Sequence, residues 1–414
     1  MNQFLIILTI FISLPFLLDV VVSLLDRSHK TKPIPDNVKD IYDEAQYKKW
    51  VFYSTEKNNK KLLSKSLSLI LQLSILLFGG YQVIETISTN LSDNIYVINL
   101  LIVVIYGIIL YVLSIVFEYI DTFIVEEKHG FNKTSHARFI KDQIIELFIT
   151  GILGGGLLVL LTFIDNKVEN MFYMYLFSIL IVVIVLFNIL FVKWIMPLFY
   201  KMSPLEEGAL KDKITALSKI SGYELSQIVV IDASTRTTKL NAFFSGFGKT
   251  KKVMIFDTLL NELTEDEICA VIAHEIGHAN YNHMFKDMAK TVVNLALYTF
   301  LFYLLATSNI IGNNLEITEY FGFVVIVFVL LLSPLGIVTK IITNIISRKH
   351  EYQADAIAVD YGFGNEMITA LKKVGRSNLA SLTPHPLFVF MKYNHPPISD
   401  RVEALENKIQ TSKK

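Results

Sequence analysis

The chain has 414 residues, of which 52% are hydrophobic and only 18% are charged. This composition excludes an ordinary soluble protein and predicts membrane spans. Lysine plus arginine and aspartate plus glutamate each number 38, so the zero net charge gives no reason to expect a nucleic-acid partner. The single cysteine, Cys269, excludes a disulfide framework and a cysteine cluster for metal, which leaves histidine and carboxylate as metal ligands.

Apolar stretches long enough to cross a bilayer recur along the chain. The first lacks the basic N-terminal region and the small-residue cleavage site of a signal peptide, so we expect it to be retained as a helix. We predict seven spans, at residues 4–25, 64–84, 96–117, 143–164, 172–192, 291–311 and 320–345. The glycines Gly151 and Gly155 in the fourth span are spaced as in closely packed membrane helices.

The loops between the spans alternate in charge. Residues 26–61 and 125–142, the segment after the fifth span and the C-terminal tail are rich in lysine and arginine, whereas the loops near 85–95, 165–171 and 312–319 contain only Lys167. By the positive-inside rule, the N-terminus lies outside, and residues 201–288 and the C-terminus are cytoplasmic.

Several polar residues lie inside or at the ends of the predicted spans. Facing lipid would be costly for them, so we expect them to face partners or water. A hydrated interior between the spans and pairing at helix interfaces are both compatible with these residues, which are Asp19, Glu118, Asp121, Asn188, Asn294 and Thr343.

Residues 201–288 are the first large polar block. Residues 204–220 have the periodicity of an amphipathic helix, and residues 227–231 and 252–256 that of short buried strands. Farther along the block, Thr264 and Glu267 have the spacing of a helix capping box, which predicts a helix start about two and a half turns before His274.

Residues 273–278 read A-H-E-I-G-H within this helix. His274 and His278 are four residues apart and project from one helix face, so two imidazoles can bind one metal ion with Glu275 beside it. This arrangement is typical of zinc peptidases, in which three protein ligands leave a fourth position for water.

The third ligand is not supplied by the metzincin pattern, H-E-x-x-H-x-x-G-x-x-H. Tyr281 and Met284 occupy the glycine and last histidine positions of that pattern. His283 would lie about 140° around the helix from His278, so we expect it to be a surface or loop histidine and not a ligand.

A thermolysin-like site instead takes a glutamate from a separate helix. Residues 347–359 have a helical pattern that contains Glu351, and Ala354 permits close approach of another helix. Asp355 shares the face of Glu351 and can accept the second N–H of a ligand histidine. Spacing alone makes Glu351 only one candidate for the third ligand, because other cytoplasmic carboxylates could also fill the role.

These motifs together resemble the Ste24-type CaaX prenyl proteases, the M48 group of integral-membrane zinc metallopeptidases. The resemblance covers nearly the whole chain. Besides H-E-x-x-H, it is carried by S-R-K-H-E-Y-Q-A-D-A at 347–356, E-K-H-G-F-N-K-T at 127–134, P-L-E-E-G at 204–208, N-A-F-F at 241–244, and N-H-P-P at 394–397 with Arg401. Residues 237–240, T-T-K-L, differ from the serine and histidine that relatives tend to have there.

The resemblance implies an all-α membrane protein whose seven helices form a water-filled chamber. A cytoplasmic α+β metalloprotease domain of gluzincin type would close one end of it. We therefore expect residues 1–200 to hold spans one to five, 201–288 and 346–414 to form two parts of the protease domain, and 289–345 to hold spans six and seven.

The resemblance also implies roles for single residues and one Zn²⁺ per chain. The zinc ligands would be His274, His278 and Glu351, with Glu275 as general base and Asp355 supporting a ligand. His395 would stabilise the reacting carbonyl, Arg401 would bind substrate, and Asn241, Ala242 and Phe243 would lie on an edge strand that pairs with the substrate backbone.

The substrate is less constrained than the reaction. The family's eukaryotic members imply cleavage of prenylated CaaX proteins, by a monomer in the endoplasmic reticulum membrane. The richness in isoleucine, lysine and asparagine favours a bacterial source, with turnover of membrane proteins or peptides at the inner membrane. The alternative to an enzyme is a seven-span transporter or receptor in which H-E-x-x-H occurs by chance.

Overall fold

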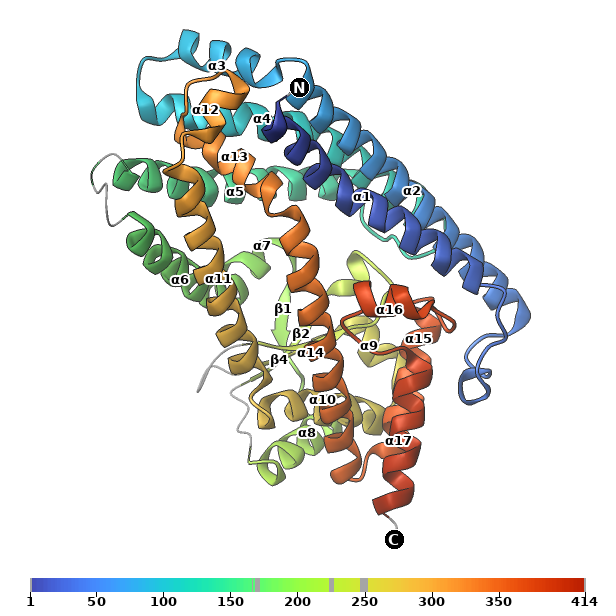
Figure 1. The fold of residues 1–414 in the computed structure, drawn as a ribbon. Helices are drawn as coiled ribbons and strands as arrows, with labels where there is room; N and C mark the ends of the chain where they lie inside the picture. Colours follow the sequence, from blue (N-terminus) through green and yellow to red (C-terminus); the bar gives the residue numbers. More distant parts are fainter. Residues whose placement is uncertain (1, 166, 168–171, 223–226, 246–251, 413–414) are drawn as a thin grey trace.

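The computed structural model describes residues 2–165, 167, 172–222, 227–245 and 252–412, which form mainly helices and one small sheet (Figure 1). The helices in chain order are α1 (Gln3–His29), η1 (Asp36–Val38), α2 (Glu44–Leu77), α3 (Gly80–Leu91), α4 (Ile95–Tyr119), η2 (Ile120–Glu126), α5 (His136–Asp165), α6 (Phe172–Leu190), η3 (Phe191–Ile195), α7 (Met196–Phe199), α8 (Ala209–Ile220), η4 (Ala233–Thr235), α9 (Asp257–Glu262), α10 (Glu265–Asn280), α11 (His283–Ala306), α12 (Ile310–Leu315), α13 (Phe321–Leu331), α14 (Ser333–Asp360), α15 (Gly364–Ser377), α16 (Pro386–Lys392) and α17 (Ile398–Ser412). The strands are β1 (Met202–Pro204), β2 (Gln227–Ile231), β3 (Ala242–Ser245) and β4 (Lys252–Phe256).

Among the described residues, four helical segments are long and apolar enough to cross a membrane: α1, α4 with η2, α5 and α11. Three bent pairs, α2 with α3, α6 with η3 and α7, and α13 with α14, raise the number to seven if each pair is one span. Every predicted apolar stretch overlaps one of these helices or pairs, although residues 307–311 and Tyr320 lie outside them. The chain is therefore a mainly helical, multi-pass membrane protein, as predicted.

The bends and extensions of these helices were not predicted. Between α2 and α3 the axis turns by 72° at Gly79, whose φ of +75° favours glycine. In addition, α2 begins at Glu44, inside residues 26–61, which we expected to be a loop. The apolar run marks only the part of a helix that contacts lipid, whereas this helix continues into polar surroundings.

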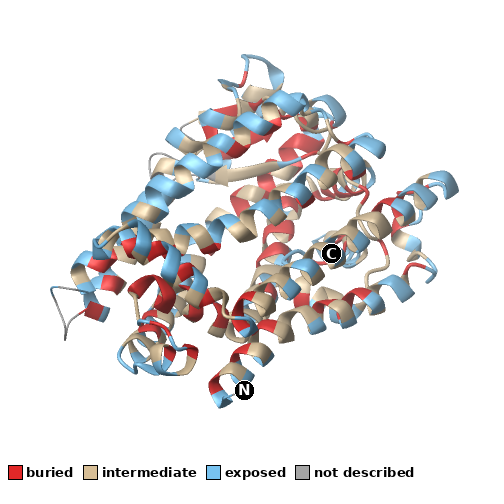
Figure 2. Cartoon of the chain, turned by 90° about the horizontal axis from the view of Figure 1, so that it is seen from above, coloured by how far each residue is buried: buried red, intermediate tan, exposed pale blue. Residues whose placement is uncertain are grey.

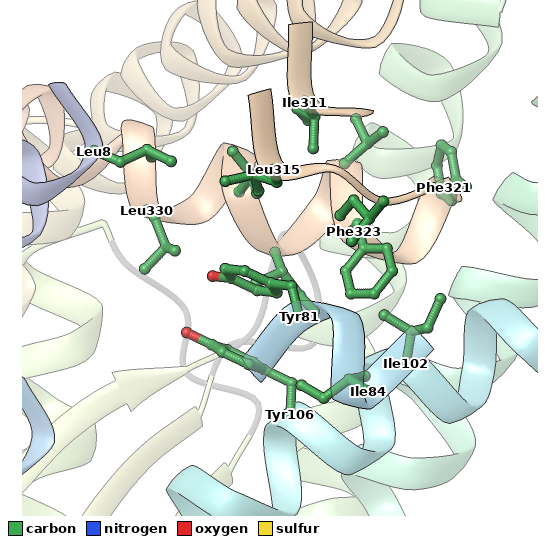
Figure 3. Close-up of a cluster of buried hydrophobic side chains, with 14 of the residues drawn as sticks. Leu8, Tyr81, Ile84, Ile102, Tyr106, Ile311, Leu315, Phe321, Phe323 and Leu330 are labelled. Atoms are coloured by element: carbon green, nitrogen blue, oxygen red, sulfur yellow. The ribbon is translucent and has the colours of Figure 1, made fainter. Parts of the chain in front are cut away.

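The packed interior of the bundle joins α1, α3, α4, α12 and α13 (Figure 3). Tyr81 of α3 lies edge-on to Phe323 of α13, with ring centroids 5.8 Å apart, and stacks with Tyr106 of α4 at 6.3 Å. Buried residues concentrate where helices meet, and exposed ones run along their outer faces (Figure 2). Of the two glycines in α5, only Gly155 faces a neighbouring helix: a Cβ there would lie 3.4 Å from Leu100 Cδ1 of α4, whereas a Cβ at Gly151 would have no neighbour within 4 Å.

Two of the polar residues predicted to face partners, Asp19 and Asp121, form ion pairs with lysines of other helices. Asp19 of α1 pairs with Lys65 of α2 and Lys392 of α16. Asp121 of η2 likewise pairs with Lys57 and Lys60 of α2. The side chain of Asn188 lies outside the described residues. The hydrated interior stays a prediction.

The sheet has the strand order β1-β2-β4-β3. The inner pair, β2 and β4, is parallel, and β1 and β3 flank it as antiparallel edge strands. The sequence predicted β2 and β4 with their observed bounds. It missed β1, because Pro204 was assigned to a helix that begins only at Ala209.

Helix α10 packs in the interior of the protease segment. A buried core surrounds it, formed by side chains of α8, β2, β4, α15 and α17. Its start shows the predicted capping box, in which Thr264 and Glu267 each bond the other's backbone N–H. On its other side, Gly277 contacts Ala354 of α14, where a Cβ on the glycine would lie 2.8 Å from the Ala354 Cα. The close contact brings the motif helix against the end of the last span (Figure 1).

Candidate metal centre

Three side chains from α10 and α14 converge on one point. The Nε2 atoms of His274 and His278 lie 3.2 Å apart. Glu351 Oε2 lies 3.6 Å from His274 Nε2, and Glu351 Oε1 lies 3.4 Å from His278 Nε2. Helical spacing on α10 and the close approach of α14 at Ala354 produce this convergence.

The three residues fit a catalytic zinc ion. Two imidazole nitrogens and a carboxylate are a ligand set of catalytic zinc sites, and one atom from each residue can be chosen so that all lie within 4.8 Å of one another. Glu351 Oε2 is buried without a hydrogen bond of acceptable geometry, although His395 Nδ1 lies 2.8 Å from it. A bound cation would satisfy this oxygen.

Asp355 contacts the first candidate ligand, His274. Its Oδ1 lies 2.8 Å from His274 Nδ1 and accepts a hydrogen bond from it, which leaves Nε2 to bind the metal. Arg401 of α17 donates to the same carboxylate through Nε and Nη2. Burial opposes the charge of Arg401, but the attraction of Asp355 outweighs it and raises the arginine's pKa above its ordinary value.

Arg401 lies behind the ligands and is buried, with Nη1 3.4 Å from Glu351 Oε2. It is not among the residues that line the cavity described below. Its contacts are those of a group that orients ligands, and the role in substrate binding implied by the resemblance stays a prediction.

The prediction of a surface or loop position for His283 is wrong. Only 2% of the residue is exposed, and its Nδ1 lies 3.0 Å from Nδ1 of His278. The predicted angle between His283 and His278 assumed one continuous helix. The helix instead ends before Asn282, whose φ is +54°, and α11 begins at His283. Among the described residues, the side chains that converge as a possible metal site are those of His274, His278 and Glu351.

A cavity of about 610 Å³ opens in front of the converging ligands. Its lining includes all three of them together with Glu275, His395 and residues of α6, α11 and β3. Burial raises the pKa of Glu275 above its ordinary value, and the nearby histidines only partly offset this effect. His395 has a side chain that is 58% exposed at the cavity. A carboxyl group and an imidazole therefore share one cavity with the candidate ligands.

The edge strand β3 forms another wall of this cavity. Asn241, Ala242, Phe243 and Phe244 all line it, and Asn241 directly precedes the strand. Strand β3 pairs with β4 on one side and, among the strands of the described residues, is the last of the sheet on the other side.

A network that the sequence did not reveal holds the segment before β3. Lys239 Nζ lies 2.9 Å from Glu126 Oε2 of η2 and 2.9 Å from the hydroxyl of Tyr53 in α2. Asn378, directly after α15, accepts a hydrogen bond from the Leu240 backbone N–H at 2.9 Å. The start of the edge strand is thereby tied to both the membrane helices and the protease segment.

Comparisons with known proteins agree with this architecture. Residues 25–201 match the family model for the CAAX prenyl protease N-terminal region with five membrane helices, and residues 204–409 match the model for peptidase family M48. CAAX prenyl protease 1 of Saccharomyces cerevisiae is 36% identical over 70% of this chain and 68% of its own length. A CAAX prenyl protease 1 homolog of Dictyostelium discoideum is 31% identical over 91% and 90%, and one of Homo sapiens is 28% identical over 92% and 90%.

A solved structure extends the similarity to the whole fold. The crystal structure of Ste24p from S. mikatae superposes with a TM-score of 0.92 at 29% identity, and covers 98% of this chain and 100% of that one. The multi-pass helical fold and the histidine–glutamate site define an integral-membrane metallopeptidase. The chain belongs to peptidase family M48, together with the CAAX prenyl proteases. Family membership excludes the transporter or receptor alternative.

Proposed function

We propose that this protein is a one-zinc endopeptidase that cleaves C-terminal peptide bonds of prenylated CaaX proteins. The observation that carries the proposal is the convergence of His274, His278 and Glu351 in front of a cavity walled by an edge strand. Similarity to CAAX prenyl protease 1 over about nine-tenths of both chains in several relatives supports the substrate class.

The chain's own residues would carry the proton transfers. Zinc, when bound, would act as a Lewis acid toward water and the scissile carbonyl. Glu275 lies in the cavity beside the ligands, and its raised pKa suits a base that takes a proton from water and returns it to the leaving amine. His395 donates to the developing oxyanion from the cavity wall.

Substrate would bind as an added strand. Because β3 is an edge strand that lines the cavity, its outer backbone groups can pair with an extended peptide that passes Asn241, Ala242 and Phe243. Such pairing is formed by hydrogen bonds between backbone groups, so it requires little complementarity between side chains. Apolar walls contributed by Met284, Phe285 and Met288 of α11 suit the aliphatic residues of a CaaX end.

The test is a cleavage assay on the full-length protein in detergent with three substrates. A farnesylated CaaX peptide, its unprenylated twin and an unfolded membrane protein are compared, with Glu275→Gln as the inactive control. We expect cleavage of the farnesylated peptide with the highest kcat/KM. Preference for the unfolded membrane protein would overturn the CaaX assignment and support the alternative of membrane-protein turnover.

A further inference from the structure

The two ligand histidines have different supporting partners. His274 rests on the carboxylate of Asp355, whereas His278 rests on a second imidazole, because its Nδ1 lies 3.0 Å from Nδ1 of His283. On its other side, His283 Nε2 lies 2.9 Å from Gln353 Oε1. His278, His283 and Gln353 thus form a chain of hydrogen bonds that ends on α14.

The donors and acceptors of this chain can be assigned from one end to the other. Oε1 of Gln353 only accepts, so His283 Nε2 carries a proton and donates it. His278 must present an unprotonated Nε2 to a metal, so its own Nδ1 carries the proton. The Nδ1 of a neutral His283 is then the acceptor that this proton requires. Each atom has one role, and the assignment leaves no donor facing a donor.

The fold holds His283 in this place from several sides. Its ring stacks on that of His350, with centroids 3.8 Å apart and an interplanar angle of 10°. The positive φ of Asn282 turns the chain so that α11 begins with His283 against the motif helix. The ring therefore has little freedom to leave His278.

We propose that His283 is a positioning residue for the metal ligand His278, and that Gln353 fixes the tautomer in which it acts. The inference rests on the proposed zinc site. His283 lies outside both H-E-x-x-H and the stretch S-R-K-H-E-Y-Q-A-D-A at 347–356, and Gln353 lies within that stretch but had no role assigned to it. Helix α14 would then supply Glu351 as a ligand and also set both histidines, through Asp355 and through Gln353.

Two substitutions separate positioning from packing. His283→Phe keeps the ring and its stacking on His350 but removes the acceptor, whereas His283→Asn loses the ring and places an amide oxygen where Nδ1 was. Metal-stripped full-length protein is titrated with zinc against a fluorescent chelator, and His136→Phe, at an exposed histidine of α5, is the control. Positioning predicts about 10- to 100-fold weaker zinc binding for His283→Phe and near wild-type binding for His283→Asn. Packing predicts the reverse order, and that result would overturn the inference.

A second pair of variants, at Gln353, tests the inference if the His283→Phe protein does not fold. Gln353→Glu retains an acceptor for His283 Nε2, and Gln353→Met does not. We expect only the methionine variant to bind zinc more weakly, and equal affinity of the two would contradict the role of Gln353. Absence of zinc from the wild type would overturn the proposed function itself, whereas zinc bound equally by wild type and all variants would overturn only this inference.

Discussion

Arg401 and Asp355 form a buried, bidentate ion pair, with Nε 2.8 Å from Oδ2 and Nη2 2.7 Å from Oδ1. The same Oδ1 lies 2.8 Å from His274 Nδ1. The pair joins α17, near the end of the chain, to the motif helix through α14. Loss of either charge would therefore affect both folding and metal binding.

The variant Asp355→Asn tests this link. An asparagine can still accept from His274, but it leaves the buried guanidinium without its partner, so we expect the free energy of unfolding to fall by about 3–5 kcal/mol. Zinc affinity should fall about 10- to 100-fold. Thermal unfolding and chelator competition in detergent measure the two effects, and Asp355→Asn/Arg401→Met should recover part of the stability. A variant Arg401→Met with normal zinc affinity and a raised KM would instead support the substrate-binding role.

Glu275→Gln should separate chemistry from metal binding. The amide cannot take a proton from water, so kcat should fall by about 10²–10⁴-fold. Zinc content, measured by elemental analysis of the same preparation, should not change because Glu275 is not one of the converging ligands. Turnover by a zinc-loaded Glu275→Gln variant would contradict the assignment.

Gly277→Ala should open the contact between α10 and α14. The added Cβ would lie 2.8 Å from Cα and 3.0 Å from the carbonyl oxygen of Ala354, so the two helices must move apart. Overpacking of this kind costs about 1–3 kcal/mol, and it should also weaken zinc binding by separating the histidines from Glu351. Gly107→Ala in α4 is the control, because a Cβ there meets nothing within 4 Å. Equal melting temperatures and zinc affinities of the two variants would refute the prediction.

The tie between Lys239 and Glu126 should matter for substrate affinity. Lys239→Met removes the contacts that hold the segment before β3, and we expect kcat/KM to fall about fivefold, chiefly through KM, as loss of about 1 kcal/mol implies. Lys239→Arg should retain most of the activity, and Lys219→Met at an exposed position of α8 should have no effect. A fall in kcat alone would show that the tie serves the chemistry and not the strand.

Membrane topology can be tested with single cysteines. The native Cys269 is buried, and burial raises its pKa to about 11, so it should not react with a maleimide near neutral pH. Cysteines at Ser92 and at Glu406 serve as probes of opposite sides. In intact cells, an impermeant maleimide should label the first and not the second. The opposite result would reverse the orientation inferred from the charged loops.

Much of the site could be predicted because its signals are local. The capping box at Thr264 located the helix start, and the four-residue spacing placed both histidines on one face. Ala354 indicated the close approach that brings Glu351 to them. The two inner strands are continuous apolar runs, so they were recognised with their full bounds.

The remaining features depend on contacts between distant segments. His283 was misplaced because a left-handed residue at Asn282 ends one helix and begins another, and nothing in the helical period shows this break. The spacing of Gly151 and Gly155 suggested helix packing, but it does not show that only Gly155 faces a neighbour, Leu100 of α4. The anchoring of Lys239 by Glu126, more than a hundred residues earlier, has no local signal.

The separation of His278 from Glu351 along the chain also governs biosynthesis. Helices α11, α12 and α13 lie between them, so a ribosome must complete the last membrane helices before the third ligand exists. A nascent or truncated chain that ends before α14 carries the two histidines and the base but lacks Glu351, Gln353 and Asp355. If these residues hold the metal, as proposed, proteolytic competence would arise only after the final helices have been made, and unfinished chains would be unable to cleave their neighbours.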